Sequence, residues 1–215
     1  MRVRSRRRAG RKKVRTSRTP LACFLALAAM AGCSKTIEWE EEVGLTDGRT
    51  IEVHRSVTLG PQQYFPERVR FVIRQALSFD SPKNPSQTIR YENDGSLSPM
   101  ALDLLPDGRP MLVTLPVIGR DHVKWKCPSP PYVAFVYDGA WKRVRVADVP
   151  ARVVDANLIV SGIWNRGMDA GRRFSKTEVS NANASLSKVT RTIDRNAKGV
   201  DDCAAVDPRP VTNPR

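Results

Sequence analysis

Cys33 is the residue whose position in the sequence points most directly to chemistry. It follows Ala31 and Gly32 at the end of a run of apolar residues, and residues 1–20 hold ten Lys or Arg and no acid. A basic segment, an apolar run of about 7–15 residues and small residues at the cleavage point define a secretory signal. The apolar run is too short for a transmembrane helix, which needs about 20 residues. We therefore expect an export signal over residues 1–32.

The sequence Met30-Ala31-Gly32-Cys33 resembles the lipobox of bacterial lipoproteins. The resemblance implies that the Cys33 thiol receives a diacylglycerol, that a dedicated signal peptidase cuts before Cys33, and that the new amino group is acylated. Residues 33–36 would then form a lipidated anchor and a short polar spacer. Two alternatives stay open, namely an ordinary cleaved signal that leaves Cys33 as a plain thiol, and a cytosolic protein with an uncleaved basic arm.

The net charge of +14 belongs mostly to the leader. Ten of the 36 Lys and Arg lie in residues 1–20, and all 22 acids lie after residue 32, so the remaining chain carries a net charge of only +4. A strongly basic chain would suggest nucleic acid as a partner, but this charge is removed with the signal. We therefore expect no nucleic-acid partner, and the 183 residues that remain suit one domain.

Two cysteines, Cys127 and Cys203, remain after the leader and the lipidated residue. An even pair in an oxidising envelope predicts a disulfide. It would close a 76-residue loop, which the chain-entropy model values at about 4 kcal/mol. The alternative is two unpaired thiols. Neither cysteine belongs to a Cys-x-x-Cys motif, so we expect neither redox catalysis nor a zinc site.

Residues for acid–base or metal chemistry are sparse after the leader. The two histidines are His54, in an alternating stretch, and His122, next to Asp121. A hydrolase that used either would need partners brought together by the fold, because the chain has no Gly-x-Ser-x-Gly nucleophile motif. No third ligand stands at metal spacing from His122. We therefore predict no catalytic residue, no metal and no other cofactor.

Three consecutive acids, Glu40-Glu41-Glu42, suggest paired carboxylates or calcium. In a strand, alternation places Glu40 and Glu42 on one face and Glu41 on the other. A solvated edge strand explains the run more simply, because charge there discourages edge pairing.

The four tryptophans could line a groove for sugars or peptides, although aromatic residues of β domains more often belong to the core. Trp125 and Tyr132 are the best candidates for ligand binding, because the prolines around them predict an exposed loop.

Asp-Gly turns between apolar runs organise the chain after the leader. Asp47-Gly48, Asp107-Gly108 and Asp138-Gly139 are each flanked by such runs, which is a strong hairpin signal. The fold class is therefore mainly β, a single antiparallel β-sandwich or barrel-like domain built of hairpins. The expected elements are hairpins over 37–59, 101–115 and 132–146, strands over 68–79 and 87–92, and a proline-rich loop over 81–86.

The C-terminal third has a weaker pattern. Residues 157–164 predict a last strand, and apolar residues spaced by three and four positions predict a helix within 176–198. Residues 207–215 hold three prolines and are expected to be a disordered tail. The β-rich domain, of periplasmic type, would thus cover 37–206.

Part of this domain resembles a set of uncharacterised Gram-negative lipoproteins. The resemblance implies an envelope lipoprotein of unknown role, and Ser34 after the lipid cysteine is similar to lipoproteins forwarded to the outer membrane. The matching residues are 33–43, 47–51, 53–56, 130–133 and 137–141.

Three functions therefore compete. The first is a non-enzymatic lipoprotein, anchored to a membrane through acylated Cys33, whose domain binds an envelope protein or glycan. The second is an envelope hydrolase that acts on cell-wall or lipid material through His54 or His122. The third is a cytosolic nucleic-acid-binding protein that keeps its basic arm.

Overall fold

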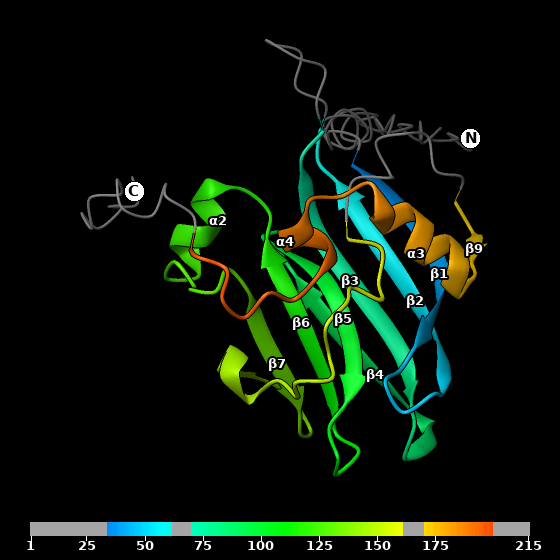
Figure 1. Ribbon diagram of the computed structural model, residues 1–215. Coiled ribbons are helices and arrows are strands. Elements are labelled where there is room, and N and C mark those ends of the chain that lie inside the picture. The colour runs from blue at the N-terminus through cyan, green and yellow to red at the C-terminus, as the bar shows by residue number, and fades with distance from the viewer. Residues whose placement is uncertain (1–33, 62–69, 161–169, 200–215) are drawn as a thin grey trace, which may run out of the picture. The chain divides into compact units, whose positions relative to one another are not determined.

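The structure, a computed structural model, describes residues 34–61, 70–160 and 170–199, and these form two β-sheets with short helices (Figure 1). The five-stranded sheet holds, in spatial order, β4 (Asn84–Asn93), β3 (Val72–Ser81), β2 (Thr50–Leu59), β1 (Lys35–Gly44) and β9 (Arg172–Phe174). The four-stranded sheet holds, in order, β5 (Leu97–Leu104), β6 (Pro110–Pro116), β7 (Val133–Tyr137) and β8 (Trp141–Val144). The helical elements are α2 (Gly119–Lys124), the 3₁₀ turn η2 (Val146–Asp148), α3 (Lys176–Ala184) and α4 (Lys188–Arg191).

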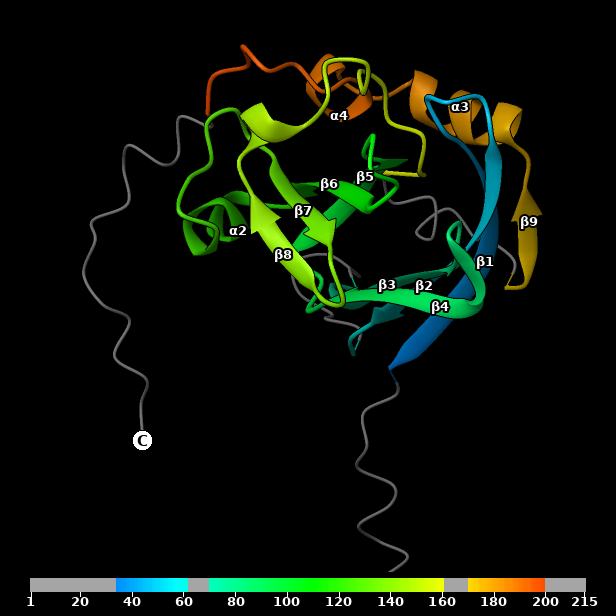
Figure 2. The ribbon, with the colours of Figure 1, turned by 90° about the horizontal axis from the view of Figure 1, so that it is seen from below.

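The mainly β prediction is confirmed. Both sheets are antiparallel meanders, apart from β9, which pairs with β1 in the parallel direction. Each predicted Asp-Gly turn closes a hairpin, and Gly48 and Gly108 have φ values of +90° and +76°, which a residue with a Cβ adopts only at a cost. The two sheets face each other and do not join into one closed barrel (Figure 2).

Alternating apolar residues from the two sheets form the core between them. Val53, Leu77 and Phe79 of the five-stranded sheet belong to the same buried cluster as Leu112 and Phe135 of the four-stranded sheet. Every residue of β5 is buried, because a second cluster covers the other face of its sheet with residues from 149–160 and 193. The C-terminal segment is therefore a third layer over the four-stranded sheet.

Side chains span the two sides on which the sheets do not pair. On one side, Trp141 of β8 donates a hydrogen bond from Nε1 to the Arg90 carbonyl of β4 at 2.7 Å, and its ring lies edge-on to Tyr91. On the other side, residues 157–160 lie between β1 and β5. The sandwich is thus closed by individual contacts and not by a continuous strand ladder.

The prediction of a loop over 81–86 is wrong, because β4 begins at Asn84 and contains Pro85. Only Pro82 and Lys83 separate the paired residues Ser81 and Asn84. Strand β4 is the edge of its sheet, and an edge strand tolerates the missing N–H of proline on its outer side.

The prediction of a strand over 157–164 is wrong for residues 157–160, and the rest of that stretch lies outside the described residues. Side chains satisfy much of the backbone of this segment in place of a ladder. The Ile159 N–H donates to Glu41, and the Val160 N–H donates to Asn183. Asn183 also donates from Nδ2 to the Leu158 carbonyl at 2.7 Å.

The C-terminal helix within 176–198 is confirmed, but it is divided into α3 and α4 at Ser185–Ser187. Serine competes for backbone hydrogen bonds and favours helix ends over helix interiors. Ser175 begins α3 with a capping box, in which its Oγ accepts from the Glu178 N–H and the Glu178 carboxylate accepts from the Ser175 N–H. No helix among the described residues has the length and apolarity to cross a membrane.

Candidate functional site

The predicted lipid anchor lies directly before the described chain. Cys33 itself is outside the described residues, and β1 begins at Lys35, two residues after it and two earlier than the predicted start at 37. Two extended residues span at most about 7 Å. In the sequence only Ser34 separates Cys33 from β1.

An open cleft of about 790 Å³ lies beside β8. Its walls come from two segments, the turn before β7 and the stretch from β8 into η2, which brings Tyr132, Arg143 and Arg145 to one surface. Both arginines are exposed, and Arg145 forms an ion pair with Asp148 at 2.8 Å. This surface offers guanidinium groups and apolar side chains to a ligand, a combination that suits an acidic protein or glycan.

Tyr132 lines the cleft, but its side chain also holds the C-terminal segment in place. Its ring is 1% exposed and belongs to the core of the four-stranded sheet. Its hydroxyl lies 3.0 Å from the Val189 carbonyl and 2.9 Å from the Thr192 carbonyl, and it accepts from the Asp194 N–H. Burial raises the pKa of Tyr132.

Trp125 lies behind the cleft and not on an exposed loop. It is half-buried, its ring lies edge-on to Phe135 of the core, and its Nε1 donates to Ser96 Oγ at 3.1 Å. The Arg143 guanidinium covers the ring at 5.8 Å from its centroid and donates to the Trp125 carbonyl. Of the two predicted aromatic ligands, the structure therefore places Tyr132 on the cleft wall and Trp125 beneath Arg143.

The structure does not bring the two histidines together. His54 is exposed on β2, directly opposite Glu40 of β1, in a shallow hollow of about 350 Å³ on the outer face of the five-stranded sheet. His122 is buried in α2, which connects β6 to β7 of the four-stranded sheet. Burial raises the pKa of the neighbouring Asp121, against the hydrogen bond that this carboxylate accepts from the Ile118 N–H. In the described ranges, no group of three His, Cys, Asp or Glu residues could hold a metal ion.

The middle glutamate of the acidic run is a core residue. As predicted, Glu40 and Glu42 share the outer face and Glu41 faces the other way, but the edge-strand explanation is wrong, because β1 lies between β2 and β9. Glu41 is 0% exposed and pairs with the equally buried Arg55 of β2 at 3.3 Å.

Three further contacts surround this buried pair. The Glu41 carboxylate accepts from Trp39 Nε1 at 2.5 Å and from the Ile159 N–H at 3.0 Å, and the Arg55 guanidinium lies 5.3 Å from the centroid of the Trp39 ring. Burial raises the pKa of Glu41, whereas Arg55 and the two N–H donors lower it. The pair therefore fastens residues 157–160 to the five-stranded sheet. The sequence carried the signal, since Glu41 and Arg55 occupy inward positions of two neighbouring strands.

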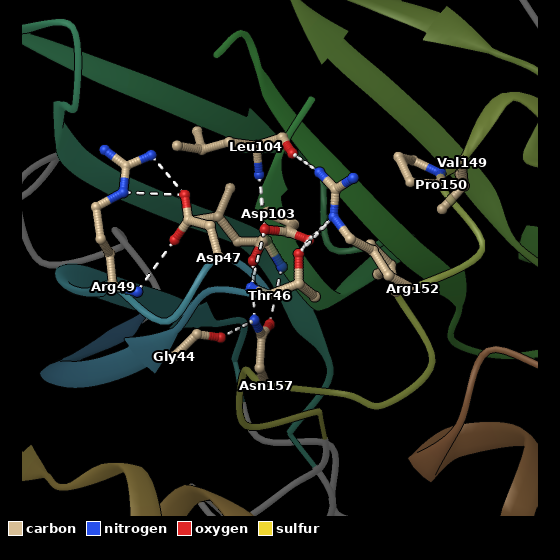
Figure 3. A network of polar contacts seen from close by, with 12 residues as sticks. Gly44, Thr46, Asp47, Arg49, Asp103, Leu104, Val149, Pro150, Arg152 and Asn157 are labelled. Carbon is tan, nitrogen blue, oxygen red and sulfur yellow. Dashed lines mark hydrogen bonds and ion pairs between the residues drawn. The ribbon is translucent and has the colours of Figure 1, made fainter. Parts of the chain in front are cut away.

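A second polar network joins the two sheets at the end where the hairpin turns lie (Figure 3). Buried Asp103 of β5 accepts from the N–H and Oγ1 of Thr46, in the turn after β1. Arg152 donates to Thr46 Oγ1 and to the Leu104 carbonyl, both at 2.7 Å. Asn157 donates from Nδ2 to both sheets, to the carbonyl of β1's last residue and to one in β5. The polar residues of this network therefore have a structural role, because they connect the two sheets.

The cysteine prediction is not tested by the described residues, because Cys203 lies outside them. Cys127 lies in the turn after α2, where its N–H donates to the His122 carbonyl at 2.7 Å.

Comparisons of the whole chain with protein-family models, with curated proteins and with solved structures each find no match.

Proposed function

We propose that this chain is a bacterial envelope lipoprotein that is anchored in a membrane through lipid on Cys33 and uses its β-sandwich to bind an envelope partner. The observation that carries the proposal is the start of β1 at Lys35, two residues after Cys33. A folded body that begins two residues after the predicted acylation site would be kept close to the membrane by a lipid there. We also propose that the protein resides in an oxidising compartment, where Cys127 and Cys203 form a disulfide.

The binding surface that we assign is the arginine-bordered cleft of about 790 Å³ beside β8. Arg143 and Arg145 stand at its rim with exposed side chains, and the Pro128–Pro130 turn forms the opposite wall. A protein or glycan that carries carboxylate or phosphate groups would fit this chemistry, because guanidinium groups bind such anions with charge-assisted hydrogen bonds. The proposed role is binding and not catalysis.

Metabolic labelling with a clickable fatty acid tests the anchor. Cys33→Ala should abolish the label and leave the leader uncut, whereas Cys23→Ala, a matched control within the leader, should be labelled and processed like the wild type. A labelled Cys33→Ala variant would contradict the proposal.

Photo-crosslinking in intact cells tests the cleft. A crosslinking residue in place of exposed Ala147, on the cleft wall, should capture one specific partner. Capture should fall several-fold in the Arg143→Glu/Arg145→Glu background, and it should persist with Arg90→Glu, which alters an exposed arginine on the other sheet. Equal capture in all three backgrounds would argue against the cleft.

A further inference from the structure

The strand connections divide the sandwich into two ends. The hairpin turns β1–β2, β3–β4, β5–β6 and β7–β8 lie at one end, called here the distal end. The connections β2–β3, β4–β5 and β6–α2–β7 lie at the other, the proximal end, as the pairing of the strands requires. The first residue of β1, Lys35, pairs with Leu59 and therefore also lies at the proximal end. In Figure 1 the start of β1 and helix α2 lie toward the top, and the hairpin turns toward the bottom.

Exposed apolar side chains collect at the proximal end. Of the seven large apolar residues that are exposed in the described ranges, five lie there. We call these five the proximal patch: Phe71 (42% exposed), Ile73 (48%), Val117 (47%), Ile118 (41%) and Val123 (36%).

Backbone contacts join the segments that carry the proximal patch. The Gly60 N–H donates to the Phe71 carbonyl, which holds the end of β2 against the start of β3. The turn after β4 packs on the same place, since a Cβ added at Gly95 would lie 2.5 Å from the Val72 carbonyl oxygen. The next residue, Ser96, accepts a hydrogen bond from the Val117 N–H at 3.2 Å. These contacts link β3 to the segment that enters α2.

A bulge in β3 explains why part of the patch is exposed. Leu77 and Phe79 point into the core, but the pairing with β2 shifts between Thr58 and Leu59, so that Val72 pairs with Leu59 and packs against the core. Phe71 and Ile73, on either side of Val72, are each more than 40% exposed. Apolar side chains that gather on the surface without cover mark a site for interaction.

Basic residues outnumber acidic ones around the patch. Lys35, Arg74, Arg120 and Lys124 lie at this end, and Arg120 keeps 74% of its side chain exposed. Three of these four cations are paired, Arg74 with Glu92, Lys124 with Asp94 and Arg120 with Asp121, so the named residues keep an excess of one positive charge. Exposed apolar residues bordered by cations are typical of surfaces that bind the interface of an anionic bilayer.

We infer that the proximal patch docks on the lipid surface itself, so that the anchored domain sits with α2 and the start of β3 against the bilayer. The inference rests on the proposed function, because lipid on Cys33 is what would bring this end to the membrane. The bilayer is favoured as the occupant because the chain leaves the described domain toward residue 33 at this end and because the border is cationic. The distal turns would then face away from the membrane.

Crosslinking to lipid tests the inference on the protein as cells process it. The purified protein is reconstituted in vesicles of phosphatidylethanolamine and phosphatidylglycerol that contain a photoactivatable phospholipid, and crosslinked peptides are mapped by mass spectrometry. We expect crosslinks within 70–74 and 117–124 and none within the distal turns 46–49 and 107–109. Crosslinks spread equally over both ends would overturn the inference.

Two variants make the test specific. Ile73→Ser combined with Ile118→Ser should lower lipid crosslinks at the proximal end at least about fivefold. Val154→Ser is the matched control, because Val154 is also 48% exposed but lies at the distal end, beside the polar network of Asp103 and Arg152. Far-ultraviolet circular dichroism of both variants checks that the sandwich is intact.

The intact mass of each sample separates the two proposals. Lipid on Cys33 with no crosslinks in the proximal patch would refute docking and leave the anchor standing. Crosslinks between two protein molecules at the patch, in place of lipid, would show that a second copy is the occupant and would also refute docking. A product without lipid on Cys33 would refute both proposals.

Discussion

Replacing Arg55 by methionine probes the least expected feature of the core, the buried pair between Glu41 and Arg55. Both side chains are at most 1% exposed. Methionine fills similar space without charge, so the variant leaves the Glu41 carboxylate buried with only the N–H groups of Trp39 and Ile159 as donors. Removing one partner of a buried ion pair costs about 3–5 kcal/mol. A domain of this size has a free energy of unfolding of roughly 5–15 kcal/mol, so the loss is a large share of the total.

Urea unfolding of the chain from residue 34 onward, followed by circular dichroism, measures the change. Arg55→Met should lower the free energy of unfolding by about 3–5 kcal/mol at pH 8. The double variant Glu41→Gln/Arg55→Met should recover about 1–2 kcal/mol, within the range of coupling between contacting residues. Arg90→Met is the matched control, since Arg90 forms an exposed pair that is worth at most about 1 kcal/mol.

The pH dependence of the same variant gives an independent check. Burial raises the pKa of Glu41, and Arg55 is the largest influence that lowers it, so Arg55→Met should raise that pKa further. A carboxyl whose pKa is raised by folding binds more protons in the folded state, and stability then falls as the pH increases from the unfolded pKa to the folded one. The deficit of Arg55→Met relative to the wild type should therefore shrink on acidification from pH 8 to pH 5. A deficit below about 1 kcal/mol at pH 8, or one that grows on acidification, would refute this account of the pair.

Three further predictions concern the C-terminal layer and the contacts between the sheets. Tyr132→Phe removes the hydroxyl that holds the α4 segment, and it should lower stability by about 1–2 kcal/mol and speed proteolysis near α4; unchanged cleavage would contradict the role of that hydroxyl. Asn157→Ala removes hydrogen bonds to β1 and β5 and should lower the free energy of unfolding by about 2 kcal/mol. Amide hydrogen exchange should become faster in 157–160, and a change confined to other segments would contradict this role of Asn157. Cys127 and Cys203 should resist alkylation until a reductant is added, and immediate alkylation of both would show that they do not pair.

Local signals in the sequence were sufficient for most of the sheet structure. The Asp-Gly turns at Asp47, Asp107 and Asp138 depend on a few neighbouring residues, and all three hairpins are present. Pro82 and Pro85 predicted a loop over 81–86, but whether a proline interrupts a strand depends on the strand's position in the sheet. Pro85 is tolerated because β4 is an edge strand, and an edge position cannot be read from the segment alone.

Contacts between segments far apart in the sequence were harder to predict. Residues 157–160 are apolar enough for a strand, but Glu41 and Asn183, which lie 118 and 23 positions from their backbone partners, replace the ladder. The same reasoning applies to the ligand candidates. The prolines near Trp125 indicated a loop, but they could not indicate that Arg143 would cover the ring. Strand alternation places Glu41 and Arg55 on the same inward face of two neighbouring strands, and this shared position is the signal in the sequence for a buried ion pair.

The intact mass of the protein extracted from membranes tests the central proposal most directly. The account predicts a chain that begins at Cys33, lacks residues 1–32 and carries the added mass of a diacylglycerol and a fatty acyl group on that residue. A water-soluble product that starts at Met1 and carries no acyl group would contradict it.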